Sequence, residues 1–209
     1  VGAIVILVLG KNPLEAYGNL LQGSGLLMKE KYAGGKSILT DFLSFVDYWT
    51  PMIFAALAVA VALKAGLFNI GVSGQMLAAG FIASITVGYS ALAAPIAKPL
   101  VILVCLVVGA LVGGLIGLLK HKFNINEVVS SIMINYIVEY VTAFFIYIKF
   151  VDPISRQSIN ISDAARLTLK SVPLGELKAD IPLGIILAIA VTFVIKYIFD
   201  KTTFGYEIK

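Results

Sequence analysis

The sequence predicts an all-α fold, a polytopic membrane helix bundle with one broken helix and about five to six spans. Apolar residues make up 59% of the chain and only 13% are charged, whereas soluble domains carry about 25% charged residues. Mean hydropathy is +0.97. A stretch rich in glycine and amide side chains, 66–75, separates two apolar runs.

Six apolar runs lie at 1–10, 51–64, 75–91, 95–119, 124–149 and 181–199. The first is too short to cross a bilayer, and we expect it to be the tail of a helix whose beginning is absent. A signal peptide is the alternative, but no basic region precedes this run and no small-residue cleavage site follows it. As a helix, 51–64 would extend roughly 21 Å, short of the roughly 30 Å hydrocarbon core. We therefore expect it to continue into the broken segment or to stop at its edge.

Two longer stretches, 11–50 and 151–180, have nearly balanced acids and bases and are expected to be outer loops. Residues 38–49 place apolar side chains opposite polar ones at helical spacing, which predicts a helix in the membrane interface. A soluble amphipathic segment packed on an outer loop is the alternative. A short helix is expected from Ser162.

Basic residues lie in the short connections between apolar runs. If successive runs cross the membrane in alternating directions, these connections fall on the same side. Lysines there predict the cytoplasmic face, so the amino end is expected to be cytoplasmic. The residues are Lys64, Lys120, His121, Lys122, Lys201 and Lys209. Because these charges are spread over several connections and form no single patch, a nucleic-acid partner is not expected.

The broken segment is the first candidate for a substrate path. Gly66, Gly71 and Gly74 allow the backbone to leave helical geometry. Asn69, Ser73 and Gln75 can bond the backbone groups that such a break exposes, and in lipid a break survives only where it faces protein or water.

The second candidate is a polar stripe on the helix that begins near 124. Glu127, Ser131, Asn135 and Glu139 are each four residues apart, which predicts that they share one face. The alternative for Glu127 is a carboxylate that complements the helix dipole. For Glu139 it is a hydrogen-bonded or protonated structural residue, and for Ser131 and Asn135 it is hydrogen bonding between helices.

Gly109, Gly113 and Gly117 form a stripe that predicts close helix packing, within the chain or at a dimer seam. The single Cys105 rules out an internal disulfide. No His and Cys cluster, nucleophile elbow or His-Glu-x-x-His motif occurs in the sequence, so we expect no catalytic site and no metal site.

Two motifs carry a family resemblance: KAGLFNIGVSGQM at 64–76 and NEVVSSIMINYI at 126–137. The region 38–209 resembles the permease subunit of bacterial nucleoside and simple-sugar ABC importers. The resemblance implies a subunit of the inner membrane that pairs with an identical or sister permease. It also implies cytoplasmic ATPase subunits that bind the ATP, so that no cofactor is expected in this chain, and an extracytoplasmic binding protein that delivers the ligand.

Two departures from that family matter. Ser73 stands where the family often has Glu, and the coupling segment that usually follows Thr203-Phe204-Gly205 is missing. We therefore expect 1–209 to be a single transmembrane domain, truncated at both ends. Our hypothesis is alternating access, with the broken segment and the polar stripe lining the path of a nucleoside or related sugar through the lipid bilayer.

Two rival functions remain. A proton-coupled secondary carrier would use Glu139 as its protonatable group. An intramembrane hydrolase would pair Glu127 with Glu139, but roughly 18 Å of helix axis separates them, far beyond the 5 to 9.5 Å of working carboxylate pairs.

Overall fold

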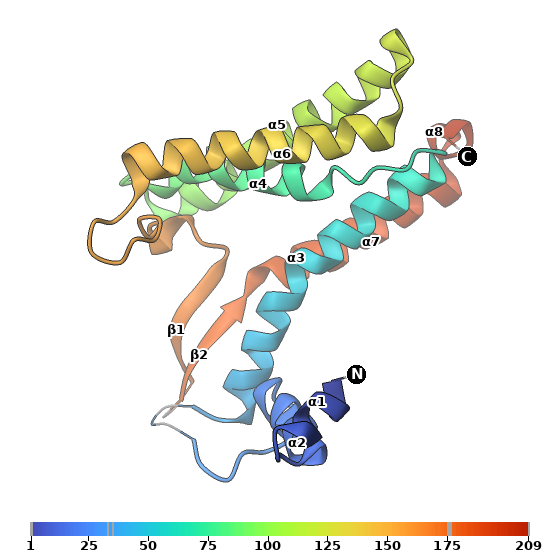
Figure 1. The fold of residues 1–209 in the computed structure, drawn as a ribbon. Coiled ribbons are helices and arrows are strands. Elements are labelled where there is room, and N and C mark those ends of the chain that lie inside the picture. The colour runs from blue at the N-terminus through green and yellow to red at the C-terminus, as the bar shows by residue number, and fades with distance from the viewer. Residues whose placement is uncertain (1, 33, 35, 175–176, 209) are drawn as a thin grey trace. The chain divides into compact units, whose positions relative to one another are not determined.

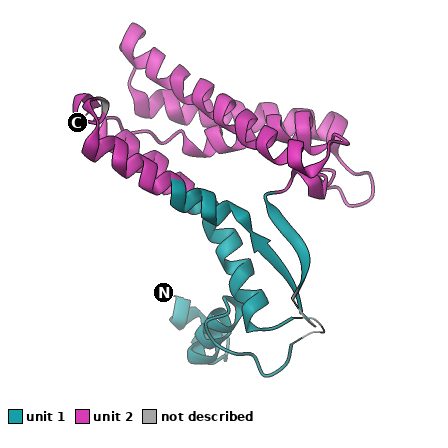
Figure 2. Cartoon of the chain, turned by 180° about the vertical axis from the view of Figure 1, so that it is seen from behind, with its two compact units in different colours: residues 1–52, 167–190 teal, residues 53–166, 191–209 magenta. Residues whose placement is uncertain are grey.

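A computed structural model describes residues 2–32, 34, 36–174 and 177–208. Val1, in the first predicted span, and Lys209, in the predicted basic set, lie outside them. The chain divides into two compact units, residues 1–52 with 167–190 and residues 53–166 with 191–209 (Figures 1 and 2).

The first unit contains two short helices and a hairpin. Helix α1 is Gly2–Val8 and helix α2 is Pro13–Gly23. The N-terminus of α2 is capped by Asn12, whose Oδ1 accepts from Leu14 N at 3.0 Å. The antiparallel strands β1 (Thr168–Leu174) and β2 (Leu177–Pro182) lie where an outer loop was expected. This hairpin is an addition to the predicted all-α class.

Helix α3 runs unbroken over Ile38–Lys64 and contains Pro51. Residues 38–49 were expected to form a separate interfacial helix, which is wrong, because they are continuous with 51–64 in one helix. Of the two alternatives for 51–64, the helix stops at the edge of the broken segment and does not continue into it. A proline inside a helix removes one hydrogen bond and clashes with the carbonyl four residues before it, yet here the helix continues. The span therefore gains its length on its N-terminal side, because 38–49 supplies the turns that 51–64 lacks.

The second unit contains the most tightly associated helices. Helix α4 (Val72–Ala83) continues as the π-helix η1 (Ser84–Gly88) and packs on both α5 (Ala94–Phe123) and α6 (Glu127–Phe145). Helix α6 continues as the π-helix η2 (Ile146–Phe150). Helix α7 (Leu183–Lys201), which begins in the first unit, ends in the second and is followed by α8 (Thr203–Ile208).

Four helical segments of the described chain are long and apolar enough to cross a membrane. They are Ile38–Lys64, Ala94–Phe123, Glu127–Phe150 and Leu183–Lys201, and Val72–Gly88 is a shorter apolar helix. The chain is therefore a multi-pass membrane protein, and the predicted class of a polytopic helical bundle is confirmed. The run at 1–10 contributes only the seven-residue helix α1.

The segment after η2 folds back onto the ends of α4 and α5. Ser162 starts the short 3₁₀ helix η3 (Asp163–Ala165), and its Oγ accepts from Ala164 N at 3.3 Å. A small buried core of Val87, Ala97 and Ala165 fixes this segment against the two helices.

Candidate functional site

The chain leaves helical geometry between the end of α3 and the start of α4. Leu67 N donates to Ala62 O at 2.9 Å and Gly66 N to Leu63 O at 3.1 Å. This pair of bonds is a Schellman motif, whose turning residue adopts a left-handed conformation. Gly66 has φ +69°, so its position in the predicted break has a direct backbone cause.

A tight turn then leads into α4. The Asn69 Oδ1 accepts from Gly71 N at 2.8 Å, as in the turns that asparagine side chains make with backbone two residues ahead. Gly71 itself has φ −75°, so it needs no special backbone freedom. Its requirement is space, because a Cβ there would lie 2.6 Å from Ile116 Cδ1 and 3.2 Å from Ser131 Cβ.

The side chain of Asn135 in α6 forms two hydrogen bonds to the backbone of the break and of the adjacent helix. Its Oδ1 accepts from Gly74 N at 2.9 Å and its Nδ2 donates to Ile70 O at 3.0 Å. One amide thereby satisfies a backbone donor in the first turn of α4 and a backbone acceptor in the irregular segment. A Cβ on Gly74 would lie 2.6 Å from the same Oδ1, so glycine is what allows this approach.

Helix α4 begins at Val72, which corrects the limits of the predicted break. The irregular backbone covers 65–71, and Ser73, Gly74 and Gln75 belong to the first turn of α4. Ser73 is exposed and lines a separate apolar hollow of about 610 Å³ with residues of α3. Gln75 faces α5, because its Nε2 would lie 3.2 Å from a Cβ on Gly113.

The predicted polar stripe on α6 is divided by the fold. Ser131 is fully buried, and its Oγ donates to Val128 O at 3.0 Å. Glu127 pairs with Lys120 across the turn between α5 and α6, with 2.8 Å between Oε1 and Nζ. Glu139 is exposed, so within this chain it does not share the covered face of Ser131, and its place in the substrate path stays a prediction.

The glycine stripe on α5 is also divided. Gly113 meets Gln75, whereas a Cβ on Gly109 or Gly117 would have open space within 4 Å among the described residues. Within this chain, close packing is therefore found at the middle glycine, and the outer two leave the α5 surface free.

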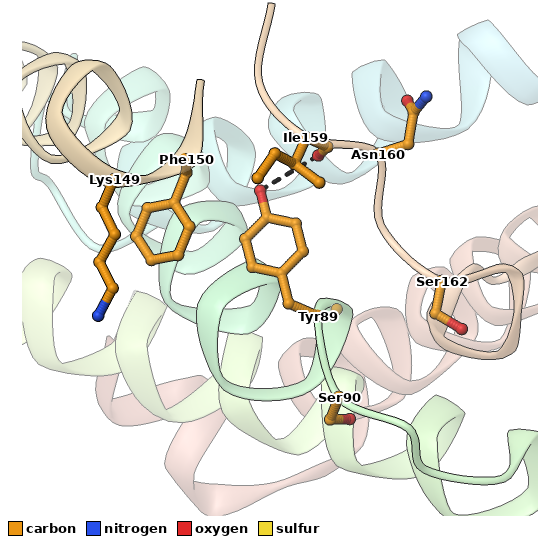
Figure 3. A pocket seen from close by; sticks show the side chains of 8 residues that line it. Tyr89, Ser90, Lys149, Phe150, Ile159, Asn160 and Ser162 are labelled. Atoms are coloured by element: carbon orange, nitrogen blue, oxygen red, sulfur yellow. Dashed lines mark hydrogen bonds between the residues drawn. The ribbon is translucent and has the colours of Figure 1, made fainter. Parts of the chain in front are cut away.

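The described residues bring together no three His, Cys, Asp or Glu side chains that could hold a metal ion. Sequence reasoning missed a hollow of about 450 Å³ lined by Tyr89, Lys149, Phe150 and Asn160, among others (Figure 3). Two polar residues, Tyr89 and Ser90, interrupt the apolar runs at this point and are a signal that could have indicated it.

Comparison with known proteins gives a family match over residues 42–209, to the family described as branched-chain amino acid transport system, permease component. The chain is 33% identical over its full length to the nucleoside ABC transporter permease protein NupB of Lactococcus lactis, and covers 56% of it. It is 34% identical over its full length to the guanosine ABC transporter permease protein NupP of Bacillus subtilis, again covering 56%.

A third relative is the glucose ABC transporter permease protein TsgB13 of Haloferax volcanii, with 30% identity over the full chain and 54% of the relative covered. The chain therefore spans about half the length of the curated relatives it matches. No solved structure matches it.

Proposed function

The chain belongs to the family of permease components typified by branched-chain amino acid transport systems, and we propose that it forms part of the membrane subunit of an ABC importer for nucleosides. Two of the relatives are named as nucleoside and guanosine permeases, and the third as a glucose permease. Nucleosides and glucose are neutral and rich in hydroxyl groups, which favours an uncharged path over a ring of charged side chains.

The observation that carries this proposal is the irregular segment 65–71 held by Asn135. Non-helical backbone at membrane depth is tolerated only where it is buried in protein or lines a water-filled cavity. Here amide groups of Asn69 and Asn135 satisfy three backbone groups of the break and of the adjacent turn. Such a segment places uncharged hydrogen-bonding groups inside an apolar bundle. Hydroxyl-rich ligands exchange hydrogen bonds with such groups at low net cost.

The proposed topology places the C-terminal ends of α3, α5 and α7 in the cytoplasm. These ends carry Lys64, Lys120 and Lys201, as the excess of lysine and arginine in cytoplasmic connections predicts. Helix α3 then begins on the outer side, so the cytoplasmic amino end that we also propose requires the run at 1–10, where the structure describes the seven-residue helix α1, to be the tail of a longer span. On the cytoplasmic side we propose separate ATPase subunits that bind ATP, and on the other an extracytoplasmic binding protein. A second permease subunit, identical or sister, completes the assembly in a bacterial inner membrane.

The proton-coupled alternative is not favoured. The relatives are named as ABC permeases, and Glu139, which would carry the proton, is exposed with no hydrogen bond or ion pair among the described residues.

The test is uptake of radiolabelled guanosine, glucose and leucine by cells that express the full-length permease with its ATPase and binding protein. We expect guanosine uptake that stops when the ATPase is inactivated, that resists a proton uncoupler and that persists in Glu139→Gln. Uptake that follows the proton gradient and disappears in Glu139→Gln would refute the importer, and uptake of leucine alone would refute the substrate class.

A further inference from the structure

A second site lies at the end of α4 that is remote from the break. The hollow of about 450 Å³ is formed where the two π-helices η1 and η2 end, and the segment after η2 closes one side (Figure 3). Its volume falls in the range of about 300–1,000 Å³ typical of small-molecule sites. Single π-turns within α-helices occur often at functional sites, and here two of them meet at one hollow.

The walls are fixed by bonds within the chain. Tyr89 Oη donates to Ile159 O at 3.2 Å (Figure 3), and Ser162 N donates to Gly88 O at 2.8 Å. A Cβ on Gly88 would lie 2.8 Å from Ile161 Cγ2, so the returning segment packs directly on the end of η1. The hollow is thus preformed by residues that this chain supplies itself.

One wall is aromatic. The Tyr89 ring is stacked on the Phe150 ring with 5.3 Å between centroids and 19° between planes. Phe81 meets Phe150 edge-on with 6.4 Å between centroids, so that three rings pack in succession. An aromatic face is a platform on which a nucleobase can stack.

The remaining lining offers uncharged hydrogen-bonding groups. Ser90 Oγ donates to Val87 O at 2.7 Å, which leaves its oxygen free to accept. Ser162 Oγ accepts from Ala164 N, which leaves its hydroxyl hydrogen free to donate. The Asn160 side chain is exposed and has no hydrogen bond among the described residues. Among the described residues of the lining, Lys149 supplies the one charged group.

We propose that this hollow binds a nucleoside on the outer side of the membrane, before the solute reaches the break. The inference rests on the proposed function and topology. The aromatic platform selects for the base, because ribose alone has no flat face to stack. The two serine hydroxyls suit ribose hydroxyls, and a single lysine is a weak site for a phosphate, which favours the neutral nucleoside over a nucleotide.

The test is photolabelling of the full-length permease, assembled with its ATPase but without its binding protein, by an azido-purine nucleoside. We expect labelled peptides from 84–90 or 146–162, with labelling that guanosine suppresses and ribose does not. Tyr89→Leu should lower labelling about tenfold, the loss expected for one stacking platform, and Tyr89→Phe should retain it. Asn160→Ala should leave labelling unchanged, because this side chain is exposed and in Figure 3 points away from the aromatic pair.

The matched control is Tyr147→Leu, because Tyr147 lies in the same η2 helix, is 75% exposed and is outside the hollow. Its labelling should equal that of the unchanged protein. Labels found only in 65–75, or labelling that survives Tyr89→Leu, would overturn the site. Guanosine uptake by the unchanged full transporter separates the two proposals, because uptake without labelling of the hollow rejects the site alone, whereas absent uptake rejects the proposed function.

Discussion

Replacing Asn135 by leucine tests whether the break depends on one amide for its stability. The change removes the acceptor of Gly74 N–H and the donor to Ile70 C=O. Gly74 is buried, so its orphaned N–H should cost about 1–3 kcal/mol. Ile70 is 40% exposed, and its carbonyl can be solvated. That bond should therefore be worth only about 0.6 kcal/mol, the average found for hydrogen bonds between membrane helices.

The expected loss in the free energy of unfolding is therefore about 2–4 kcal/mol. The assay is unfolding of the full-length permease in mixed micelles, followed by circular dichroism. Hydrogen exchange at the Gly74 amide gives a local measure, and it should accelerate in Asn135→Leu. The control is Asn19→Leu, at an exposed position of α2, which should change neither quantity.

A loss below about 0.5 kcal/mol, less than one average hydrogen bond between membrane helices, together with unchanged exchange at Gly74, would refute this reasoning. It would mean that the two backbone groups find equivalent partners without the amide. Guanosine uptake should fall in Asn135→Leu while membrane insertion remains.

Three further substitutions test the break and its surroundings. Gly74→Ala should lower stability by about 1–3 kcal/mol through overpacking against Asn135, whereas Gly80→Ala, in the same helix with open space around it, should be neutral or stabilising; equal melting temperatures for the two variants would contradict the close approach. Gly66→Ala should cost about 1–2 kcal/mol because of its left-handed φ, and the same unfolding assay should detect the loss. Glu127→Gln should leave the melting temperature nearly unchanged, since partly exposed ion pairs contribute little. A loss of uptake in that variant would therefore assign Glu127 to the transport path, whereas unchanged uptake would leave it a surface partner of Lys120.

The position of the break was predictable because its cause is local. A helix that ends at Lys64 and reverses through a glycine needs only the residues beside it in the chain, and the Schellman bonds at Gly66 and Leu67 are of this kind. The start of η3 at Ser162 was predictable for the same reason, since a serine caps a helix through its own neighbours.

The partners of Asn135 could not be predicted, because they lie 61 and 65 residues away in the sequence. Spacing alone shows which face of α6 a residue occupies but not what covers that face. The hairpin β1–β2 was missed although β2 alternates apolar and polar residues from Leu177 to Ile181, because in β1 two polar residues in succession, Lys170 and Ser171, interrupt the alternation. The register of the pair is irregular at the same place, between Leu169 and Val172.

The exposure of Glu139 has a geometric cause. A helix turns about 100° per residue, so each step of four residues advances about 40° beyond a full turn. Over the two steps from Ser131 to Glu139 the stripe therefore drifts by about 80°. Thr142, eleven residues after Ser131, returns to within about 20° of it and is buried, whereas Glu139 has rotated away from α4.

The two bonds of Asn135 also bear on how the permease can move. The ring centroids of Phe81 and Phe145 lie 6.3 Å apart further along the same two helices, so the first turn of α4 contacts the middle of α6 and the two helices contact each other again toward their C-terminal ends. Any rearrangement that keeps these contacts carries the pair as one rigid piece. We expect such a rearrangement to bend the backbone in the short link 65–69 that follows α3, at the turn formed by Gly66.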